Sequence, residues 1–418
     1  MKIVTLRAPV DDVPTTDSFR DELRIRVRNL TASSSLSFRE LVVAMEGAYP
    51  TDVQDALHSL QAEDVAVGGL RSDADSAETR TRLRSEADVV TLPEPHPLDY
   101  DWRFTEESLN SLAATIAETG AKRVAILGAP TVFLRLARAD VDVTLYDNNV
   151  HLVEELRSRQ FSKAVHCDLF TTRFEDPAFD LVVADPPWYP EHYTSFIRRA
   201  GELIKPGGSL LLSVLPRLTR PSASRDRMEI LRDAEAHGFD LVAIHPSYLT
   251  YRSPPFEQSS LHAEGIRLED WRRGDLFTFI RSTRPCCAGK EIYEFEDASL
   301  WQSFSVGRTI VRIRHRESDD REVTFRAVSP TGDVHLHSVS RRAPFRKTID
   351  VWSSRNLALR LSRPDYLCDI LRRHMNGESF GEAVSTVAIE NHASAASRNA
   401  LREIVDLILE DAGIVDNG

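Results

Sequence analysis

The spacing of hydrophobic residues predicts mainly helices at the beginning of the chain. In "SLSFRELVVAMEG", Phe38 and Met45 fall on one helical face, and in "YPTDVQDALHSLQAED" a second apolar stripe starts at Val53, behind Thr51 as N-cap. The apolar stretch "VAVGGL" follows. We therefore expect three short helices and then a strand within residues 1–70.

Strands alternate with helices from residue 100 to residue 282. The predicted strands are "RVAILG", "DVTLYD", "KAVHCD", "FDLVVAD" and "GSLLLSV", with amphipathic helices such as "TEESLNSLAATIAETG", led by Thr105 as N-cap, between them. Two later strands, "FDLVAIHPSYL" and "DLFTFIR", complete the series. Alternation over this length is typical of an α/β fold, so we expect a doubly wound parallel sheet.

The last part of the chain is predicted to form short strands and then helices. "TIVRIRHR", "VTFRAV", "IDVW" and "LALRLS" are β-branched or alternating, so residues 290–363 should form a small β-rich module. "YLCDILRRHMNG" and "ALREIVDLILEDAG" carry helical spacing within residues 364–418. Residues 71–90 are charged and poor in large apolar residues, which suits a linker or a solvated helix, and a proline-rich segment follows. Residues 71–99 would thus link the first part to the central one.

Composition narrows the class of protein. The chain has 418 residues, of which 42% are hydrophobic, enough for two or three cores. No run of eighteen apolar residues occurs, and "MKIVTLRAPVDDVPTT" becomes polar too early for a secretory signal, so we expect a cytoplasmic protein without membrane contact. The four cysteines, including the vicinal Cys286 and Cys287, show no metal-ligand spacing, which predicts reduced thiols and no metal site.

One glycine and three acids stand at the carboxyl ends of four successive predicted strands: Gly128, Asp147, Asp168 and Asp185. Ligands of open α/β sheets bind outside these ends, so the four should share one edge of the sheet. Each has a use if the ligand is an adenosine derivative. Gly128 lets the backbone approach the ligand, Asp147 can accept both ribose hydroxyls, and Asp168 can accept the adenine amino group.

The motifs "AILGAPT", "LYDNN", "CDL", "DPPW" and "KPGGSLLL" resemble, in order and spacing, those of class I, Rossmann-like S-adenosylmethionine-dependent methyltransferases. The resemblance covers residues 100–282 and implies S-adenosylmethionine as the cofactor. It implies cofactor contacts at Gly128, Ala129, Pro130, Asp147, Asn148, Asp168 and Leu169. The family's first loop usually holds several glycines, whereas "APT" follows Gly128 here, so the methionine end of the cofactor would be held differently or not at all.

The "DPPW" stretch resembles the [D/N]PP[Y/W/F] motif of amino methyltransferases. The resemblance implies a catalytic site at Asp185, Pro186, Pro187, Trp188 and Tyr189. By it, the Asp185 side chain and the Pro186 carbonyl accept hydrogens from a substrate amine, and Trp188, with Tyr189, stacks on a base or covers a cation. Proline fixes φ and can aim the carbonyl into the cleft. The alternative is that "PPWYP" is only a rigid turn at the edge of the sheet.

Two other functions stay open. The order of parts is also similar to that of branched-chain polyamine synthases, which are aminopropyltransferases that use decarboxylated S-adenosylmethionine. That family has acids directly after the first strand, which "GAPT" lacks, although Asp99, Asp101, Glu191 and Glu257 could supply acids from elsewhere. A non-catalytic Rossmann-like scaffold that assembles through its ends is the third hypothesis.

Two segments outside these motifs could line the cleft. "PLDYDWRF", residues 97–104, is either an ordered linker clamped by its aromatics or part of the substrate site. "YLTYRSPPFE", residues 248–257, is either a proline-stiffened surface loop or a lid.

The two ends of the chain differ in charge. Residues 1–70 look like a winged helix, but the helix over 51–63 has acids and no Lys or Arg, so we expect packing or a homodimer contact there, not DNA recognition. Residues 301–363 hold thirteen Lys or Arg against six Asp or Glu, in a chain whose net charge is −12. That module could bind nucleic acid or dock on the acidic N-terminal part.

Overall fold

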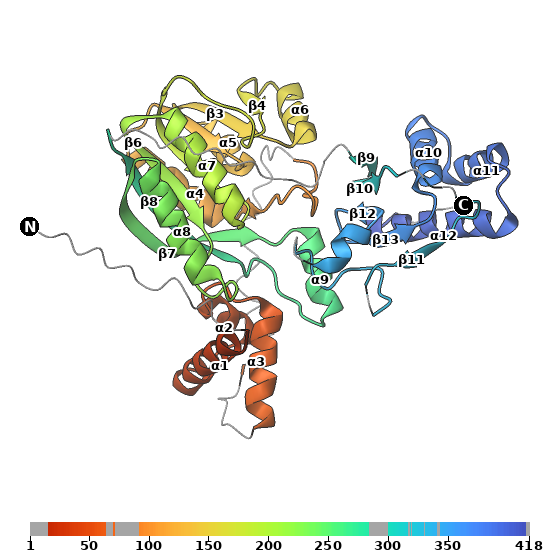
Figure 1. The fold of residues 1–418 in the computed structure, drawn as a ribbon, viewed down its shortest axis with the longest axis horizontal. Helices are drawn as coiled ribbons and strands as arrows, with labels where there is room; N and C mark the ends of the chain where they lie inside the picture. The colour runs from red at the N-terminus through yellow and green to blue at the C-terminus, as the bar shows by residue number, and fades with distance from the viewer. Residues whose placement is uncertain are drawn as a thin grey trace, which may run out of the picture.

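The computed structural model describes residues 16–63, 70–71, 92–283, 300–316, 318, 320–329, 331–340 and 343–414. Cys286 and Cys287 lie outside these ranges, and Cys167 and Cys368 are buried free thiols. The described residues fall into an N-terminal helical part, a central α/β part and a C-terminal part (Figure 1). Among these residues, no helix is long and apolar enough to cross a bilayer.

The N-terminal part consists of three helices, as expected: α1 (Thr16–Ser33), α2 (Phe38–Ala44) and α3 (Pro50–Ala62). A capping box between Ser37 and Glu40 starts α2. The predicted N-cap Thr51 is wrong: α3 begins two residues earlier, after Tyr49, because proline at the first helical position needs no N–H partner. Most of the predicted strand "VAVGGL" lies outside the described residues.

The central part is an eight-stranded sheet in the order β1-β7-β8-β6-β5-β2-β3-β4. Its strands are β1 (Arg103–Phe104), β2 (Arg123–Leu127), β3 (Asp142–Asp147), β4 (Ala164–His166), β5 (Phe179–Ala184), β6 (Ile204–Val214), β7 (Phe239–Arg252) and β8 (Arg273–Arg281). Strands β4, β3, β2, β5 and β6 are parallel, which confirms the doubly wound sheet for five strands. β8 runs antiparallel to both β6 and β7.

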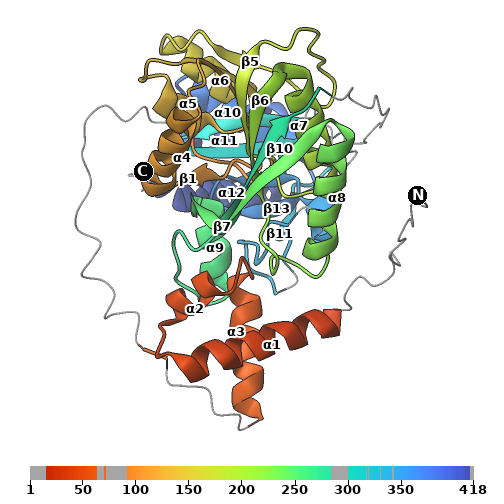
Figure 2. The same ribbon diagram turned by 90° about the vertical axis from the view of Figure 1, so that its left-hand side faces the viewer.

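Helices cover both faces of this sheet. They are α4 (Glu106–Glu118), α5 (Pro130–Leu136), α6 (Val150–Ser158), α7 (Pro190–Leu203) and α8 (Ala223–Ala236). A further helix, α9 (Pro255–Ala263), follows β7 and packs with the N-terminal helices through Leu261. Figure 2 shows α4 and α5 on one side of the strands and α7 and α8 on the other. β8 departs from the parallel pattern because the chain between β7 and β8, which carries α9, does not cross to the opposite end of the strands. β8 therefore starts at the end of the sheet where β7 stops, and it runs back beside β7.

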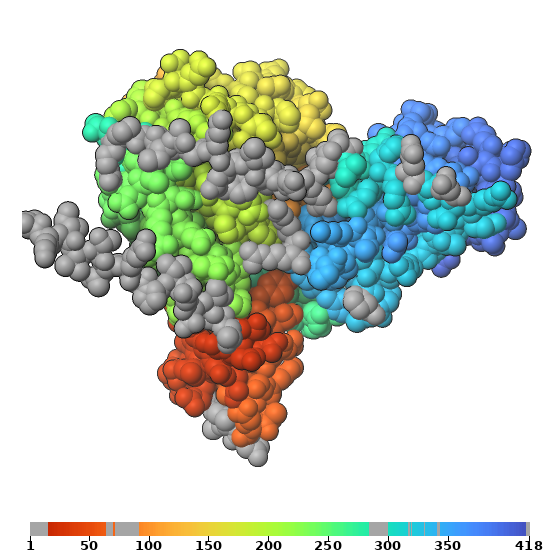
Figure 3. All heavy atoms as spheres, in the orientation of Figure 1, coloured from red at the N-terminus to blue at the C-terminus, as the bar shows by residue number. Residues whose placement is uncertain are grey.

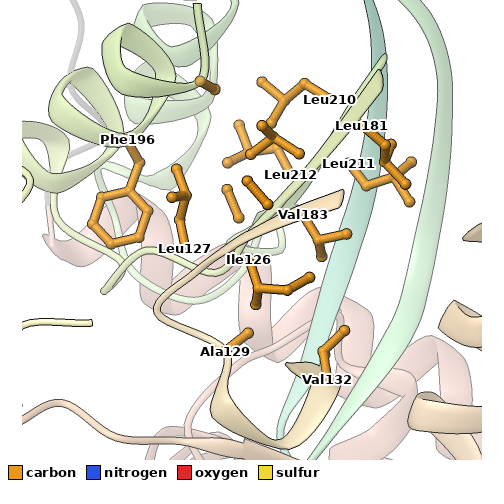
Figure 4. Packing of buried hydrophobic residues seen from close by; sticks show 14 of the residues in the cluster. Ile126, Leu127, Ala129, Val132, Leu181, Val183, Phe196, Leu210, Leu211 and Leu212 are labelled. Atoms are coloured by element: carbon orange, nitrogen blue, oxygen red, sulfur yellow. The ribbon is translucent and has the colours of Figure 1, made fainter. Parts of the chain in front are cut away.

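The core of the central part explains why the strand ends are so well fixed. Apolar side chains of β2, β5 and β6 interlock there with Phe196 of α7 (Figure 4). Ile126, Leu181 and Leu212 are fully buried. Burying side chains of this size on neighbouring strands fixes the register, since a slip by one residue would turn them to the opposite face.

The C-terminal part combines an antiparallel sheet with three helices. The strands, in the order β11-β13-β12-β10-β9, are β9 (Trp301–Val306), β10 (Thr309–Arg314), β11 (Phe325–Ala327), β12 (Val351–Ser353) and β13 (Ala358–Leu361). The helices are α10 (Pro364–Met375), α11 (Phe380–Glu390) and α12 (Ala395–Ala412). Side chains of the strands and of the helices form one hydrophobic cluster. β9 and α11 are additions to the elements expected from sequence.

The C-terminal part docks on the segment 92–102 and on α9. Arg312 of β10 makes two hydrogen bonds of 2.7 Å to the carboxylate of Asp99. His96 contacts the carbonyl of Trp352 at 3.0 Å, and Ser260 of α9 donates to the carbonyl of Leu336 at 2.8 Å. Part of the excess positive charge of residues 301–363 therefore serves this docking, and the contacts named here, all between described residues, are made with the central part.

The N-terminal helices also pack against the central part, close to α9. The backbone N–H of Leu218 donates to the carbonyl of Glu46 at 3.1 Å, and the rings of Tyr49 and Trp271 meet edge to face with centroids 5.4 Å apart. In the space-filling view of Figure 3, the N-terminal, central and C-terminal parts meet around one place.

Candidate active site

A cavity of about 300 Å³ lies where the three parts meet, at the carboxyl ends of β2 and β5. Its wall is rich in aromatic side chains and holds two carboxyls and two guanidinium groups. The lining residues are Tyr49, Pro97, Tyr100, Trp102, Gly128, Asp185, Pro186, Pro187, Trp188, Tyr189, Thr219, Arg220, Tyr251, Phe256, Glu257, Arg272, Ser338, Val339 and Ser340. Both segments that could line the cleft, 97–104 and 248–257, contribute to this wall.

Asp185 stands directly after β5 and is the central acid of the cavity. The hydroxyl of Tyr251 donates to its Oδ1 at 2.7 Å, and the hydroxyls of Tyr251 and Ser213 are 2.6 Å apart. Burial raises the pKa of Asp185 to about 7, against the opposing effect of these hydroxyls and of the Arg272 charge. A carboxylate oxygen has two lone pairs, so Asp185 keeps acceptor capacity for a ligand.

The rest of the "DPPW" stretch forms a tight turn between β5 and α7. The backbone N–H of Tyr189 donates to the carbonyl of Pro187 at 2.7 Å, and α7 starts at the next residue. Trp188 is 7% exposed and meets the ring of Tyr251 edge to face, with centroids 5.8 Å apart. Pro186 and Pro187, which lie between Asp185 and Trp188 in the chain, also line the cavity. The stretch is thus a rigid turn and also part of the cavity wall.

Gly128 brings the end of β2 against the end of β5. Its φ is +65°, a conformation that favours glycine, and a Cβ built there would lie 3.4 Å from the carbonyl oxygen of Asp185 and 3.2 Å from the ring of Phe196. Ala129 and Pro130, both buried, start α5 immediately after it. The hydroxyl of Thr131, one residue further on, is buried without a hydrogen-bond partner among the described residues.

Asp147 ends β3, the strand next to β2, and lies outside the lining of the cavity. The N–H of Asn149 donates to its Oδ1 at 2.9 Å, while Asn148 between them is exposed. Burial raises the pKa of Asp147 to about 7, and the negative charges of Asp101 and Asp99 add to this effect. The side-chain amide of Asn149 donates to Asp99 at 3.0 Å, so the loop after β3 is tied to the docking contact of the C-terminal part.

Asp168 and Leu169 follow β4 and are held in a local turn. Oδ1 of Asp168 accepts from the N–H of Phe170 at 2.9 Å, and the carbonyl of Leu169 accepts from Ser195 and Arg199 of α7, each at 2.8 Å. Both residues lie outside the lining of the cavity. Of the twelve residues predicted as site residues, the structure therefore brings Gly128 and residues 185–189 together and places the others at neighbouring strand ends.

The sequence patterns did not reveal Arg272 or Tyr49. The guanidinium of Arg272, just before β8, lies 4.1 Å from the ring centroid of Trp102 and 3.9 Å from that of Trp188. Tyr49 comes from the start of α3, more than 130 residues away from Asp185 in the chain. Neither residue belongs to a motif, because only the packing of the three parts brings them to the cavity.

The residues at these strand ends fit a nucleoside-bearing cofactor. Gly128 leaves open the space that a Cβ would fill, Thr131 keeps a buried hydroxyl without a described partner, and Asp147 ends the neighbouring strand as an acceptor. The arrangement offers contacts for a sugar and a base beside the cavity that holds Asp185.

Comparison with known proteins gives structural neighbours only. No family model matches the chain, and no curated protein matches it. The branched-chain polyamine synthase from Thermus thermophilus, solved with N4-aminopropylspermidine and 5'-methylthioadenosine, is 13% identical with a TM-score of 0.47, over 66% of this chain and 95% of that chain.

Methyltransferases are also among the structural neighbours. The CcbJ methyltransferase from Streptomyces caelestis is 13% identical with a TM-score of 0.33, over 45% of this chain and all (100%) of its own. A TehB-like S-adenosylmethionine-dependent methyltransferase from Corynebacterium glutamicum is 15% identical with a TM-score of 0.31, over 43% and 89% of the two chains. Both families that the motifs resemble are thus found among the neighbours, and at these identities the likeness concerns the fold.

Proposed function

We propose that the protein is an S-adenosylmethionine-dependent methyltransferase that acts on an amino nitrogen bound at Asp185. The observation that carries the proposal is the position of Asp185. The acid stands at the end of a central strand, beside Gly128, and its carboxylate accepts a hydrogen bond from Tyr251 inside an aromatic cavity. An acid there can bind an amine, and the rings of Trp188 and Tyr251 exclude water from it.

The residues of the strand ends would hold the cofactor. Gly128 and Thr131 would contact its sugar and sulfur region, and Asp147 would accept the ribose hydroxyls. When bound, S-adenosylmethionine supplies a methyl carbon on a positively charged sulfur, so that a carbon–nitrogen bond forms as the carbon–sulfur bond breaks. The protein's own contribution is then to position the amine and to shield it.

Asp185 would orient the amine and receive its proton. A carboxylate that accepts one N–H directs the nitrogen lone pair away from itself, and the carbonyl after Asp185 can fix the second N–H. Its pKa of about 7 lets it take a proton from the nitrogen near neutral pH.

A second candidate, aminopropyl transfer from decarboxylated S-adenosylmethionine, is favoured by the position of Asp101. The negative charge of Asp101 raises the pKa of both Asp147 and Asp185, so this acid is near enough to both proposed subsites to act on a charged cofactor tail. An acid there attracts an amine and repels a carboxylate. However, Arg103 pairs with Asp101 at 2.6 Å and neutralises much of this preference, so methyl transfer stays the first proposal.

Titration of the purified protein with both cofactors, followed by assays with labelled S-adenosylmethionine and a panel of amines, tests the proposal. Asp185→Ala should bind the cofactor as the native protein does and lose turnover. Asp176→Asn, an exposed acid on the loop that precedes β5, serves as the control and should keep full activity. Full activity of Asp185→Ala would reject the site, and no binding of either cofactor would favour the non-catalytic scaffold.

A further inference from the structure

Besides Arg220, which pairs with Asp226 at 2.7 Å, two charged groups of opposite sign in the wall of the cavity have no assigned role. They are Arg272, just before β8, and Glu257, on α9. Within the described residues, Arg272 forms no ion pair within 4.0 Å, so the two groups attract each other without touching.

Arg272 contributes its guanidinium to the wall of the cavity. The guanidinium carbon lies over the rings of Trp102 and Trp188, at 4.1 and 3.9 Å from the ring centroids. No side-chain hydrogen bond from Arg272 to another described residue is formed. Contact with the two rings recovers part of the cost of removing this cation from water, but its N–H donors have no partner among the described side chains. A planar oxyanion is the ligand that the in-plane donors of a guanidinium bind best.

Within the described part of the chain, one oxygen of Glu257 lacks a hydrogen-bond donor, as the guanidinium of Arg272 lacks an acceptor. Its side chain is 2% exposed, and Oε1 is buried without a hydrogen-bond partner among the described residues. The hydroxyl of Tyr49 interacts with this carboxyl from the N-terminal helices. A buried carboxyl oxygen without a donor is costly, so an N–H donor from a ligand would relieve that cost.

We propose that the amine acceptor carries an α-amino acid head group at its far end, with its carboxylate on Arg272 and its ammonium on Glu257. This inference rests on the proposed function, since Asp185 would hold the reacting amine at the other end. The aromatic side chains of the wall, including Trp102 and Phe256, would pack on the methylene chain between the two ends.

The two charges exclude simpler acceptors. A plain diamine would leave the donors of Arg272 unsatisfied and place a second cation beside this guanidinium. A monoamine with only a carboxylate would satisfy Arg272 but leave Glu257 without a donor and bring like charges together. Only a head group with both charges pairs each of the two residues.

Three acceptors that differ by one group each test the inference with labelled S-adenosylmethionine. They are L-lysine, 6-aminohexanoate, which lacks the α-ammonium, and 1,5-diaminopentane, which lacks the carboxylate. The same comparison is repeated for shorter methylene chains with L-ornithine and L-2,4-diaminobutanoate, each beside its analogue without the α-ammonium and its analogue without the carboxylate. For at least one length we expect kcat/KM of the diamino acid to exceed that of both relatives by about tenfold or more, because each lost charged hydrogen bond costs about that much.

Variants assign the preference to its residues. Arg272→Gln should raise KM for the diamino acid about tenfold and leave KM for the diamine unchanged. Glu257→Gln should make kcat/KM of the diamino acid equal to that of the monoamine that lacks the α-ammonium. Arg252→Gln, which removes the same charge from an exposed neighbour of Tyr251, is the matched control and should change neither.

The outcomes separate this inference from the proposed function. Turnover of a diamine at least equal to that of its diamino acid at every length would overturn the inference while leaving amine methylation in place. Binding of S-adenosylmethionine without turnover of any diamino acid would also overturn it. Failure to bind the cofactor at all would reject the proposed function itself. An unchanged preference in Arg272→Gln would show that the guanidinium only supports the stacked tryptophans.

Discussion

The hydroxyl of Tyr251 donates a hydrogen bond of 2.7 Å to Oδ1 of Asp185, and so joins the long strand β7 to the end of β5 inside the cavity. This bond favours the ionised carboxylate and partly offsets the effect of burial on its pKa. A residue of another strand thus adjusts the pKa of Asp185, the acid proposed to bind the amine, against the larger effect of burial.

Tyr251→Phe should shift the acidic limb of the pH–activity profile to higher pH. Without the hydroxyl, the ionised form of Asp185 loses a donor, and its pKa rises from the value of about 7 in the native protein. Tyr248→Phe on the same strand is the control, since that hydroxyl contacts Thr115 and Ser111 and does not line the cavity. Equal profiles for the two variants and the native protein would argue against a role of Asp185 in turnover.

Asp185→Asn should stabilise the protein more at pH 8 than at pH 5. The folded pKa of Asp185, about 7, exceeds the value of about 3.9 for an unfolded chain, so the folded state binds more protons between these pH values. The contribution of Asp185 to the free energy of unfolding therefore falls as the pH rises through this window, and asparagine escapes that loss. Thermal unfolding of the native protein and of Asp185→Asn at pH 5 and pH 8 measures this difference in stability. A larger stabilisation by asparagine at pH 5 than at pH 8 would contradict the raised pKa.

Gly128→Ala should lower both stability and cofactor affinity. The left-handed φ of +65° alone costs about 1 kcal/mol for a residue with a Cβ, and the added atom would also press on Phe196 and the Asp185 carbonyl. Gly120→Ala is a matched control, because its φ is +69° with no atom within 4 Å of a Cβ. Melting temperatures should fall for both variants, and the cofactor titration should change only for Gly128→Ala.

Arg312→Gln should loosen the C-terminal part and weaken cofactor binding. The change leaves the largely buried Asp99 without its cation, which costs about 3 kcal/mol for pairs of this kind, and frees the loop that Asn149 ties to Asp99. Arg326→Gln, an exposed arginine of the same sheet, should have little effect. Adding Asp99→Asn to the variant should restore part of the melting temperature; no restoration would show that the pair is not what holds the two parts together.

Local patterns were enough to predict the central fold and the acids at its strand ends. Buried strands such as β5 carry continuous apolar runs, and the residue after each run is therefore at the ligand edge, as Asp185 shows. α11 was missed because "FGEAVSTVAIE" contains several β-branched residues with weak helix propensity, and its packing in the shared core compensates for them.

The remaining site residues depend on contacts between distant parts of the chain. Arg272 precedes a strand without any motif, and its position between Trp102 and Trp188 follows from the docking of three segments. Tyr49 lines the cavity only because the N-terminal helices pack beside α9. Sequence spacing within one element carries no information about such encounters.

Tyr49 at one end of the chain and Ser338–Ser340 near the other both form part of the wall around Asp185. In the proposed enzyme, a change in either terminal part can therefore alter which acceptor is bound while the Rossmann-like core stays the same. A full-length chimera with exchanged ends is expected to keep this core and to prefer a different acceptor.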